Sequence, residues 1–205
     1  MDAAGVTGGF ASIPVTDKEG IRLRLERTCG PAPSRAGNLL QPGTPAAVLV
    51  GLVARPDGPS VILTERTAHL TNHPAEVSFP GGRVEPEDGG PEAAALREAF
   101  EEIGLNPAKV EILGCLPPYR TITDFCVSPI VGWIEPPVTY VPDEQEVADV
   151  FEVPLLFVVD PANHRRESIH WKGEDHGYFV LPYPGRRIWG ATAGMLVDLA
   201  RILGE

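Results

Sequence analysis

The chain has 205 residues, of which 43% are hydrophobic and 22% are charged, and its formal net charge is −11. A chain of this length and composition can bury the core of one ordinary domain, which excludes a disordered or fibrous protein. The negative charge repels a nucleic-acid backbone, and neither a bilayer-spanning apolar stretch nor a signal peptide is present. We therefore expect a cytoplasmic protein without nucleic-acid or membrane partners.

The first part of the chain, residues 1–43, mixes glycine, proline and serine with one amphipathic segment over residues 21–27. It contains no chemical motif. We interpret it as an N-terminal extension or peripheral helix, and residues 44–205 as a single domain.

The domain begins with a predicted β-hairpin. Residues 46–53 form an apolar run typical of a buried strand, residues 55–59 predict a tight turn, and residues 61–65 predict the second strand. Further along the chain we expect strands at 110–116 and 128–134, a short helix at 155–159, strands around Ile169 and at 178–181, and a last helix at 191–203. In that last helix Leu196, Leu199, Ala200 and Leu203 have the spacing of core residues.

The clearest helix covers residues 91–103. Pro91 is a typical first helical residue and Gly104 a typical stop. One predicted face joins apolar residues three and four positions apart, and we expect it to pack on the sheet. Its members are Ala93, Leu96, Phe100 and Ile103.

Three acidic residues, Glu98, Glu101 and Glu102, lie on the opposite side of this helix at i, i+3 and i+4 spacing. Ala94 and Ala95 precede them, so we expect a small, open and exposed acidic face. Like charges at this spacing cost roughly 0.2–0.5 kcal/mol per pair, and a divalent cation would remove that cost. The alternative is an ordinary solvated face of an amphipathic helix.

Arg97 immediately precedes the first of these acids. It is placed to orient a neighbouring carboxylate through paired hydrogen bonds, and a simple surface ion pair is the alternative.

The segment 82–105 resembles the Nudix box of the Nudix hydrolases, whose core reads R-E-apolar-x-E-E-x-G-apolar. Residues 97–105 follow that core, with Ala99 as a weak apolar residue. The resemblance implies a hydrolase of α+β class, built as an α/β/α sandwich around a mixed β-sheet.

Two features are similar to the coenzyme A pyrophosphatase branch of that family. The loop before the helix is one residue longer than the general pattern, and Asp88 stands where its first glutamate is expected. Residues 63–68, followed by the Phe-Pro-Gly-Gly run at 79–82, resemble the branch's upstream motif. Thr71 and Ala75 depart from it, because they replace an arginine and a glycine. Segments 146–155 and 189–193 also resemble this branch.

The resemblance implies Mg²⁺ or Mn²⁺ as cofactor, and this set of oxygen ligands suits both. The implied ligands are Gly82 through its carbonyl oxygen, Glu98, Glu101 and Glu102. The general base stays open between Glu98, Glu144 and Glu146, and we favour Glu98 or Glu146.

Substrate contacts are expected both before and after the helix in the sequence. Arg66 resembles the motif arginine and would bind a phosphate, with an exposed ion pair as the alternative. Phe79, Gly81 and Gly82 belong to the same motif. Tyr119 is the aromatic residue that we expect to stack on an adenine, with a place in the core as the alternative.

The leading hypothesis is hydrolysis of coenzyme A or an acyl derivative to adenosine 3',5'-bisphosphate and a 4'-phosphopantetheine product. A broader pyrophosphatase acting on NADH or ADP-ribose is one alternative, and a non-catalytic Nudix-fold module that binds a nucleotide is another. A third alternative is a structural role for the acidic helix in a protein interface. The partner in the leading case is a small nucleotide diphosphate, and a homodimer is left open.

Overall fold

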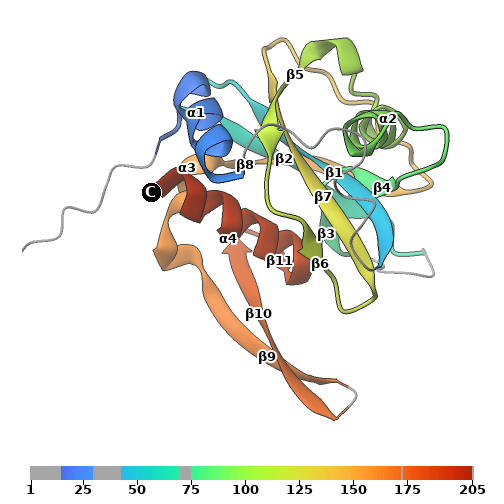
Figure 1. Cartoon of the computed structure of the whole chain (residues 1–205), viewed down its shortest axis with the longest axis vertical. Helices are drawn as coiled ribbons and strands as arrows, with labels where there is room; N and C mark the ends of the chain where they lie inside the picture. The colour runs from blue at the N-terminus through green and yellow to red at the C-terminus, as the bar shows by residue number, and fades with distance from the viewer. Residues whose placement is uncertain (1–14, 30–42, 70–74, 172, 205) are drawn as a thin grey trace, which may run out of the picture.

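The computed structural model describes residues 15–29, 43–69, 75–171 and 173–204. Its centre is a mixed eight-stranded sheet in the order β3-β2-β1-β7-β5, with β4 paired to β1, β6 to β7 and β8 to β2 (Figure 1). The strands are β1 (Thr44–Val53), β2 (Ser60–Arg66), β3 (Val77–Ser78), β4 (Gly81–Arg83), β5 (Val110–Cys115), β6 (Tyr119–Arg120), β7 (Phe125–Ile134) and β8 (Val147–Pro154).

The sheet is organised around β1. This strand is parallel to β7 along its full length and antiparallel to β2 and β4. The predicted hairpin of β1 and β2 is confirmed by the pairing of Leu52 with Val61. The predicted strands at 110–116 and 128–134 correspond to β5 and β7.

Helices cover both faces of this sheet. The helices are α1 (Lys18–Cys29), α2 (Pro91–Ile103), α3 (Leu155–Val159) and α4 (Gly190–Gly204), with two short 3-10 turns at Pro107–Lys109 and Pro161–Asn163. Alternate residues of β1 belong to two separate core clusters: Leu49 and Val53 pack with α2, whereas Val50 and Leu52 pack with α1 and α4. The expected α/β/α sandwich around a mixed sheet is therefore confirmed.

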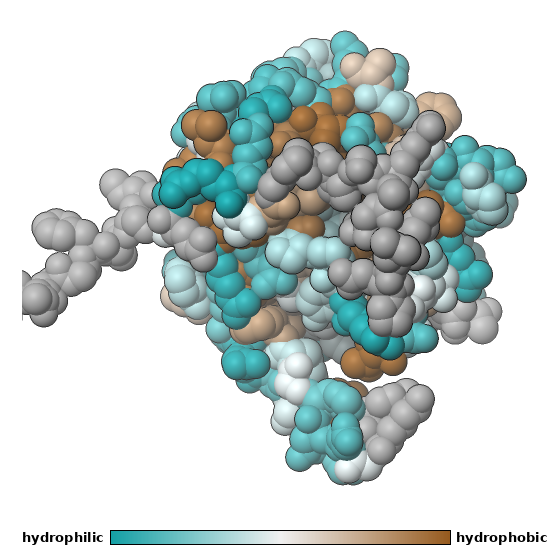
Figure 2. Space-filling view, viewed as in Figure 1, coloured by the Kyte–Doolittle hydropathy of each residue, from teal (hydrophilic) through white to brown (hydrophobic). Residues whose placement is uncertain are grey.

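A second, three-stranded antiparallel sheet consists of β9 (Arg165–Trp171), β10 (Glu174–Tyr183) and β11 (Arg186–Trp189). The two strands predicted around Ile169 and at 178–181 are β9 and β10. Their hairpin extends away from the body of the molecule in Figure 1, and its surface is largely hydrophilic in Figure 2. From β11 the chain enters α4 directly.

The predicted amphipathic segment near the N-terminus forms α1. Ile21 and Leu25 are fully buried in the same core cluster as α4, so this helix packs on the domain. The boundary between extension and domain stays a prediction. Within the described ranges, no helix combines the length and the apolar character that crossing a bilayer requires.

The predicted packing face of α2 is correct only in part. Ile103 is fully buried and Leu96 is partly buried against the same core cluster, but the other two predicted residues are exposed. Phe100 is 56% exposed and Ala93 is exposed, whereas Ala94, Ala95 and Ala99 are fully buried. Small side chains face the sheet because the helix packs close to β1 and β4, where a large side chain would not fit. The helix is rotated relative to the prediction, and this turns part of its acidic face inward.

Candidate active site

The floor of the site is the pair of glycines in β4. A side chain on Gly81 would lie 2.4 Å from the carbonyl oxygen of Ala47 on the neighbouring strand, and one on Gly82 would lie 2.4 Å from Oε1 of Glu98. Such distances are far below van der Waals contact. A glycine is therefore required at Gly81, where a side chain would meet backbone atoms, whereas at Gly82 the Glu98 carboxylate occupies the space that a side chain would take.

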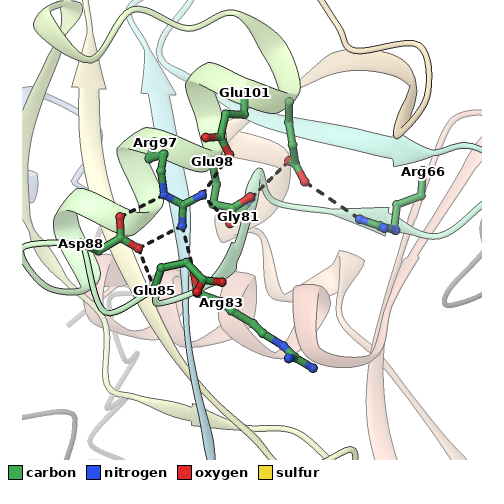
Figure 3. Close-up of polar contacts among 9 residues, drawn as sticks. Arg66, Gly81, Arg83, Glu85, Asp88, Arg97, Glu98 and Glu101 are labelled. Atoms are coloured by element: carbon green, nitrogen blue, oxygen red, sulfur yellow. Dashed lines mark hydrogen bonds and ion pairs between the residues drawn. The ribbon is translucent and has the colours of Figure 1, made fainter.

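Glu102 lies beside Glu98 on α2 and is almost completely buried, with 5% of its surface exposed. Its Oε2 accepts a hydrogen bond from the backbone N–H of Gly81 at 3.2 Å, and its Oε1 lies 4.0 Å from Nη1 of Arg66 (Figure 3). Burial raises the pKa of Glu102 to about 8, although the Gly81 hydrogen bond opposes that rise. A buried carboxylate with so little compensation is an unusual feature for a helix.

Arg97 joins the loop before α2 to the acids on it (Figure 3). Its Nε and Nη2 each donate to a different oxygen of Asp88 at 2.9 Å, and its Nη1 donates to both Glu98 and Glu101 at 2.9 Å. Nη2 also donates to the carbonyl oxygen of Arg83 at 3.1 Å. The guanidinium lowers the pKa of Asp88 through the paired hydrogen bonds. The orienting role expected for Arg97 is thus present in the structure.

Burial also raises the pKa of Glu98, and the hydrogen bond from Arg97 opposes this. The charge of Glu146 adds to the rise for both Glu98 and Glu102, so Glu146 faces these two carboxylates from another element. It comes from the loop before β8. Spacing in the sequence could not distinguish it from Glu144. Both residues are exposed on the same loop, but only the charge of Glu146 acts on Glu98 and Glu102.

Backbone contacts hold this loop at the site. The N–H of Thr67, just after β2, donates to the carbonyl oxygen of Glu146 at 2.9 Å, and its hydroxyl donates to the carbonyl oxygen of Gln145 at 3.0 Å. The N–H of Asp143 donates to the carbonyl oxygen of Glu102 at 2.9 Å. The loop is therefore attached to both β2 and the C-terminal turn of α2.

The three acids do not form the open patch that the sequence predicted. The Glu102 side chain is 6% exposed, that of Glu98 is 18% exposed and that of Glu101 is 55% exposed. In the described part of the chain, no three acidic, histidine or cysteine side chains converge on one point. Arg97 accounts for this, because it draws Glu98 and Glu101 toward itself while Glu102 turns to Gly81.

The donor set nevertheless fits a hard divalent cation. Glu98, Glu101 and Glu102 offer carboxylate oxygens from successive turns of one helix, and the backbone of Gly82 approaches Glu98 with no side chain between them. A cation there would take over the charge-neutralising role that Arg97 has toward Glu98 and Glu101.

The other residues expected to contact substrate fall in different places. Arg66 lies at the site beside Glu102, and its Nε is buried with no hydrogen-bond partner. Phe79 is 2% exposed and belongs to the core. Tyr119 packs against Gly194 of α4, where the added side chain of an alanine would meet its hydroxyl at 2.5 Å. The structure does not bring Phe79 or Tyr119 to the glutamates.

Sequence reasoning did not single out Arg83, whose carbonyl oxygen binds Arg97. Its position immediately after the glycine pair was the available signal. Of the two departures from the branch motif, Thr71 lies outside the described residues. Ala75 has φ 57°, a left-handed conformation that the motif's glycine adopts without strain.

Comparison with known proteins connects this geometry to a family. The model of the NUDIX domain matches residues 43–171. The protein described as uncharacterized Nudix hydrolase NudL from Enterobacter sp. (strain 638) is 43% identical over 159 residues, which cover 78% of this chain and 82% of that protein. The corresponding NudL of Escherichia coli (strain K12) is 41% identical over 159 residues, with the same coverage of 78% and 82%.

Solved structures with a similar arrangement include a C. elegans Ap4A hydrolase in a binary complex. It has a TM-score of 0.47 and 20% sequence identity, and the match covers 54% of this chain and 80% of that one.

Proposed function

This chain belongs to the Nudix family, as a hydrolase acting on a nucleoside diphosphate derivative, and from that premise we propose that its substrate is coenzyme A or an acyl derivative. Water would cleave the diphosphate between its two phosphorus atoms. The products would be adenosine 3',5'-bisphosphate and a 4'-phosphopantetheine. The cofactor would be Mg²⁺ or Mn²⁺.

The observation that carries the cation-dependent hydrolysis in this proposal is the contact of the Glu98 carboxylate with Gly82, next to the buried carboxylate of Glu102. Two carboxylates held against bare backbone at the cost of burial are better explained by a ligand than by solvation. When bound, a divalent cation would neutralise charge on the diphosphate and lower the pKa of the attacking water.

The protein's own residues then have separate tasks. Glu98, Glu101, Glu102 and the Gly82 carbonyl would hold the cation, and Arg97 would position Glu98 and Glu101 through the hydrogen bonds described above. Glu146 would accept the proton of the attacking water, with Glu98 as the second candidate for that role.

Arg66 would bind the diphosphate. Its guanidinium lies at the buried end of the site, 4.0 Å from Glu102. At that distance the two groups attract each other without a direct hydrogen bond, so the donors of Nη1 and Nη2 can turn to a phosphate oxygen.

The assignment to coenzyme A rests on the resemblance of residues 63–68 and 79–82 to the branch motif. Ala75 departs from that motif and weakens the assignment, although its φ of 57° is a backbone conformation that a glycine would adopt without strain. Thr71 also weakens it, and for that reason a broader pyrophosphatase acting on NADH or ADP-ribose is the second candidate. A non-catalytic module is disfavoured by the complete set of acids on α2. Cytoplasmic location and a homodimer stay predictions.

A mass-resolved hydrolysis assay tests this proposal. Purified protein with Mg²⁺ should convert coenzyme A to the two products named above. Glu98→Gln should abolish the conversion, whereas Glu92→Gln, which changes an exposed acid in the first turn of the same helix, should not. If coenzyme A stays intact while NADH or ADP-ribose is cleaved, the second candidate is correct. If the two variants are equally active, the acids of α2 have no catalytic role.

A further inference from the structure

Arg83 lies at the same edge of the sheet as the glutamates but on the other face. In β4, Gly82 pairs with Ala47, whose side chain packs with α2, and Arg83 pairs with Ala46, whose side chain packs with the opposite cluster. Successive residues of a strand point to opposite faces. Figure 3 shows the Arg83 side chain directed away from the carboxylates.

The Arg83 guanidinium is available for an anion. It lies over the ring of Phe125 at 5.7 Å from the centroid, and among the described residues it forms no ion pair with a carboxylate. Arg97, by contrast, binds Asp88, Glu98 and Glu101. A guanidinium that lies over an aromatic ring receives no hydrogen bond from it, so its N–H donors remain available for a phosphate.

The register of the strands fixes this pair. Arg83 is opposite Ala46 on β1, and Phe125 is opposite Thr44 on the other side of the same strand. The arginine side chain therefore crosses the start of β1 to reach the ring, and both residues belong to the rigid sheet. A ligand group bound there would be held in a fixed relation to Gly82.

The charges around Gly82 indicate which phosphate of the substrate would bind at Arg83. Coenzyme A carries a phosphate monoester on the same ribose as the diphosphate. On the α2 face the diphosphate would occupy the cation and Arg66, so the second phosphate would be left facing Glu98, Glu102 and Glu146 and be repelled. On the face of Arg83 it meets a cation one residue away from Gly82.

We propose that Arg83, held over Phe125, is the specificity-determining residue that binds the ribose phosphate monoester of the substrate. This inference rests on the proposed function and deepens it, because it identifies what distinguishes coenzyme A from nucleotides without that phosphate. Arg83 takes no part in bond cleavage.

Binding measured by calorimetry tests the inference without turnover. The probes are adenosine 3',5'-bisphosphate and AMP, which differ only in the 3'-phosphate, with Mg²⁺ present. The wild type should bind the bisphosphate about tenfold to hundredfold more tightly than AMP, as expected for a charge-assisted contact. Arg83→Gln should bind the two probes equally and AMP as the wild type does, and Arg83→Lys should retain part of the preference.

Arg201→Gln is the matched control, because the Arg201 guanidinium also lies over a phenylalanine ring, at 5.6 Å from the centroid of Phe179 on the projecting sheet. It should keep the full preference. Thermal unfolding of each variant checks that it is folded.

In the binding measurement, two results would overturn the inference: no preference for the bisphosphate in the wild type, or a preference that survives in Arg83→Gln. Hydrolysis distinguishes this from a failure of the proposed function. If coenzyme A is cleaved but Arg83→Gln lowers kcat/KM equally for coenzyme A and for its 3'-dephospho form, the function stands and the inference falls. If the bisphosphate preference depends on Arg83 but coenzyme A is not cleaved, the assigned substrate is wrong while the phosphate site remains.

Discussion

The helices α2 and α4 cover opposite faces of the central sheet and pack on it with different kinds of side chain. α4 buries large side chains, including Met195, Leu196 and Leu199, against the sheet. α2 buries alanines and the carboxylate of Glu102, and leaves Phe100 exposed. One helix contributes apolar area to the core, whereas the other brings its backbone close to β1 and β4 and places charge where a core residue would normally lie.

This difference supports the proposal that α2 binds a ligand at the expense of stability. Burying Glu102 near Glu98 is unfavourable in the protein alone, as the raised pKa values of both residues indicate. A helix selected only for stability would place an apolar residue at position 102.

Leu196→Ala in α4 should have the largest effect on folding. The side chain is fully buried, so its removal should lower the free energy of unfolding by about 3 kcal/mol. Denaturant unfolding with and without Mg²⁺ measures this, and the loss should be the same in both conditions. If Leu196→Ala lowers the free energy of unfolding only without Mg²⁺, the packing of α4 is coupled to the cation site.

Gly82→Ala, in β4 opposite Glu98 of α2, should lower turnover strongly and stability only slightly. The new methyl group would meet Oε1 of Glu98 at 2.4 Å, and a flexible carboxylate can move away at a cost below about 0.5 kcal/mol. Turnover should fall by about 100-fold, because the displaced oxygen no longer reaches the cation. Steady-state kinetics and thermal unfolding measure the two effects.

Gly194→Ala is the counterpart in α4. Its methyl group would meet the Tyr119 hydroxyl at 2.5 Å and ring carbons at 2.6 and 2.7 Å. A half-buried ring yields less readily, so we expect a loss of about 1 kcal/mol of stability and retention of most turnover. If Gly82→Ala is less stable than Gly194→Ala, the proposed difference between the α2 and α4 packing sites is wrong.

Glu102→Gln should change how stability depends on pH. The pKa of Glu102 is raised from 4.5 to about 8 in the folded protein, so its ionisation opposes folding. The stability of the metal-free wild type should be full below the usual pKa and decline as the pH rises toward 8. At about pH 9 the variant should be more stable than the wild type by about 2 kcal/mol.

Addition of Mg²⁺ should restore the stability of the wild type and not alter that of Glu102→Gln. Thermal unfolding across the pH range measures both trends. A metal-free wild type whose stability does not change over this range would mean that Glu102 is compensated by contacts other than those described.

Phe100→Ser should have the smallest effect. A ring that is 56% exposed should contribute less than about 0.5 kcal/mol to folding. A loss of several kcal/mol in denaturant unfolding would indicate that Phe100 packs in the core, as the sequence predicted.

The sequence predicted what depends on local signals. The bounds of α2 and its end at Gly104 were predicted correctly, and Gly104 has φ 67° and donates its N–H to the carbonyl oxygen of Phe100. The core positions of α4 followed from large apolar residues at helical spacing, because Leu196, Leu199 and Leu203 are all buried.

The orientation of α2 could not be predicted in this way. It depends on Gly81 and Gly82, which belong to β4, and on the closeness of β1, which contributes no signal to the helix sequence. Side-chain size favoured Phe100 as the buried residue, but close backbone packing favoured the alanines. The position of Glu146 beside Glu98 likewise depends on a loop attached through Thr67, which sequence spacing does not reveal.

A calorimetric titration with Mn²⁺ tests the central claim that the carboxylates above Gly81 and Gly82 bind a divalent cation. The wild type and Glu92→Gln should bind Mn²⁺ with the same affinity, and Glu98→Gln and Glu102→Gln should each bind it at least about tenfold more weakly. Equal Mn²⁺ affinity in all four proteins would contradict the account.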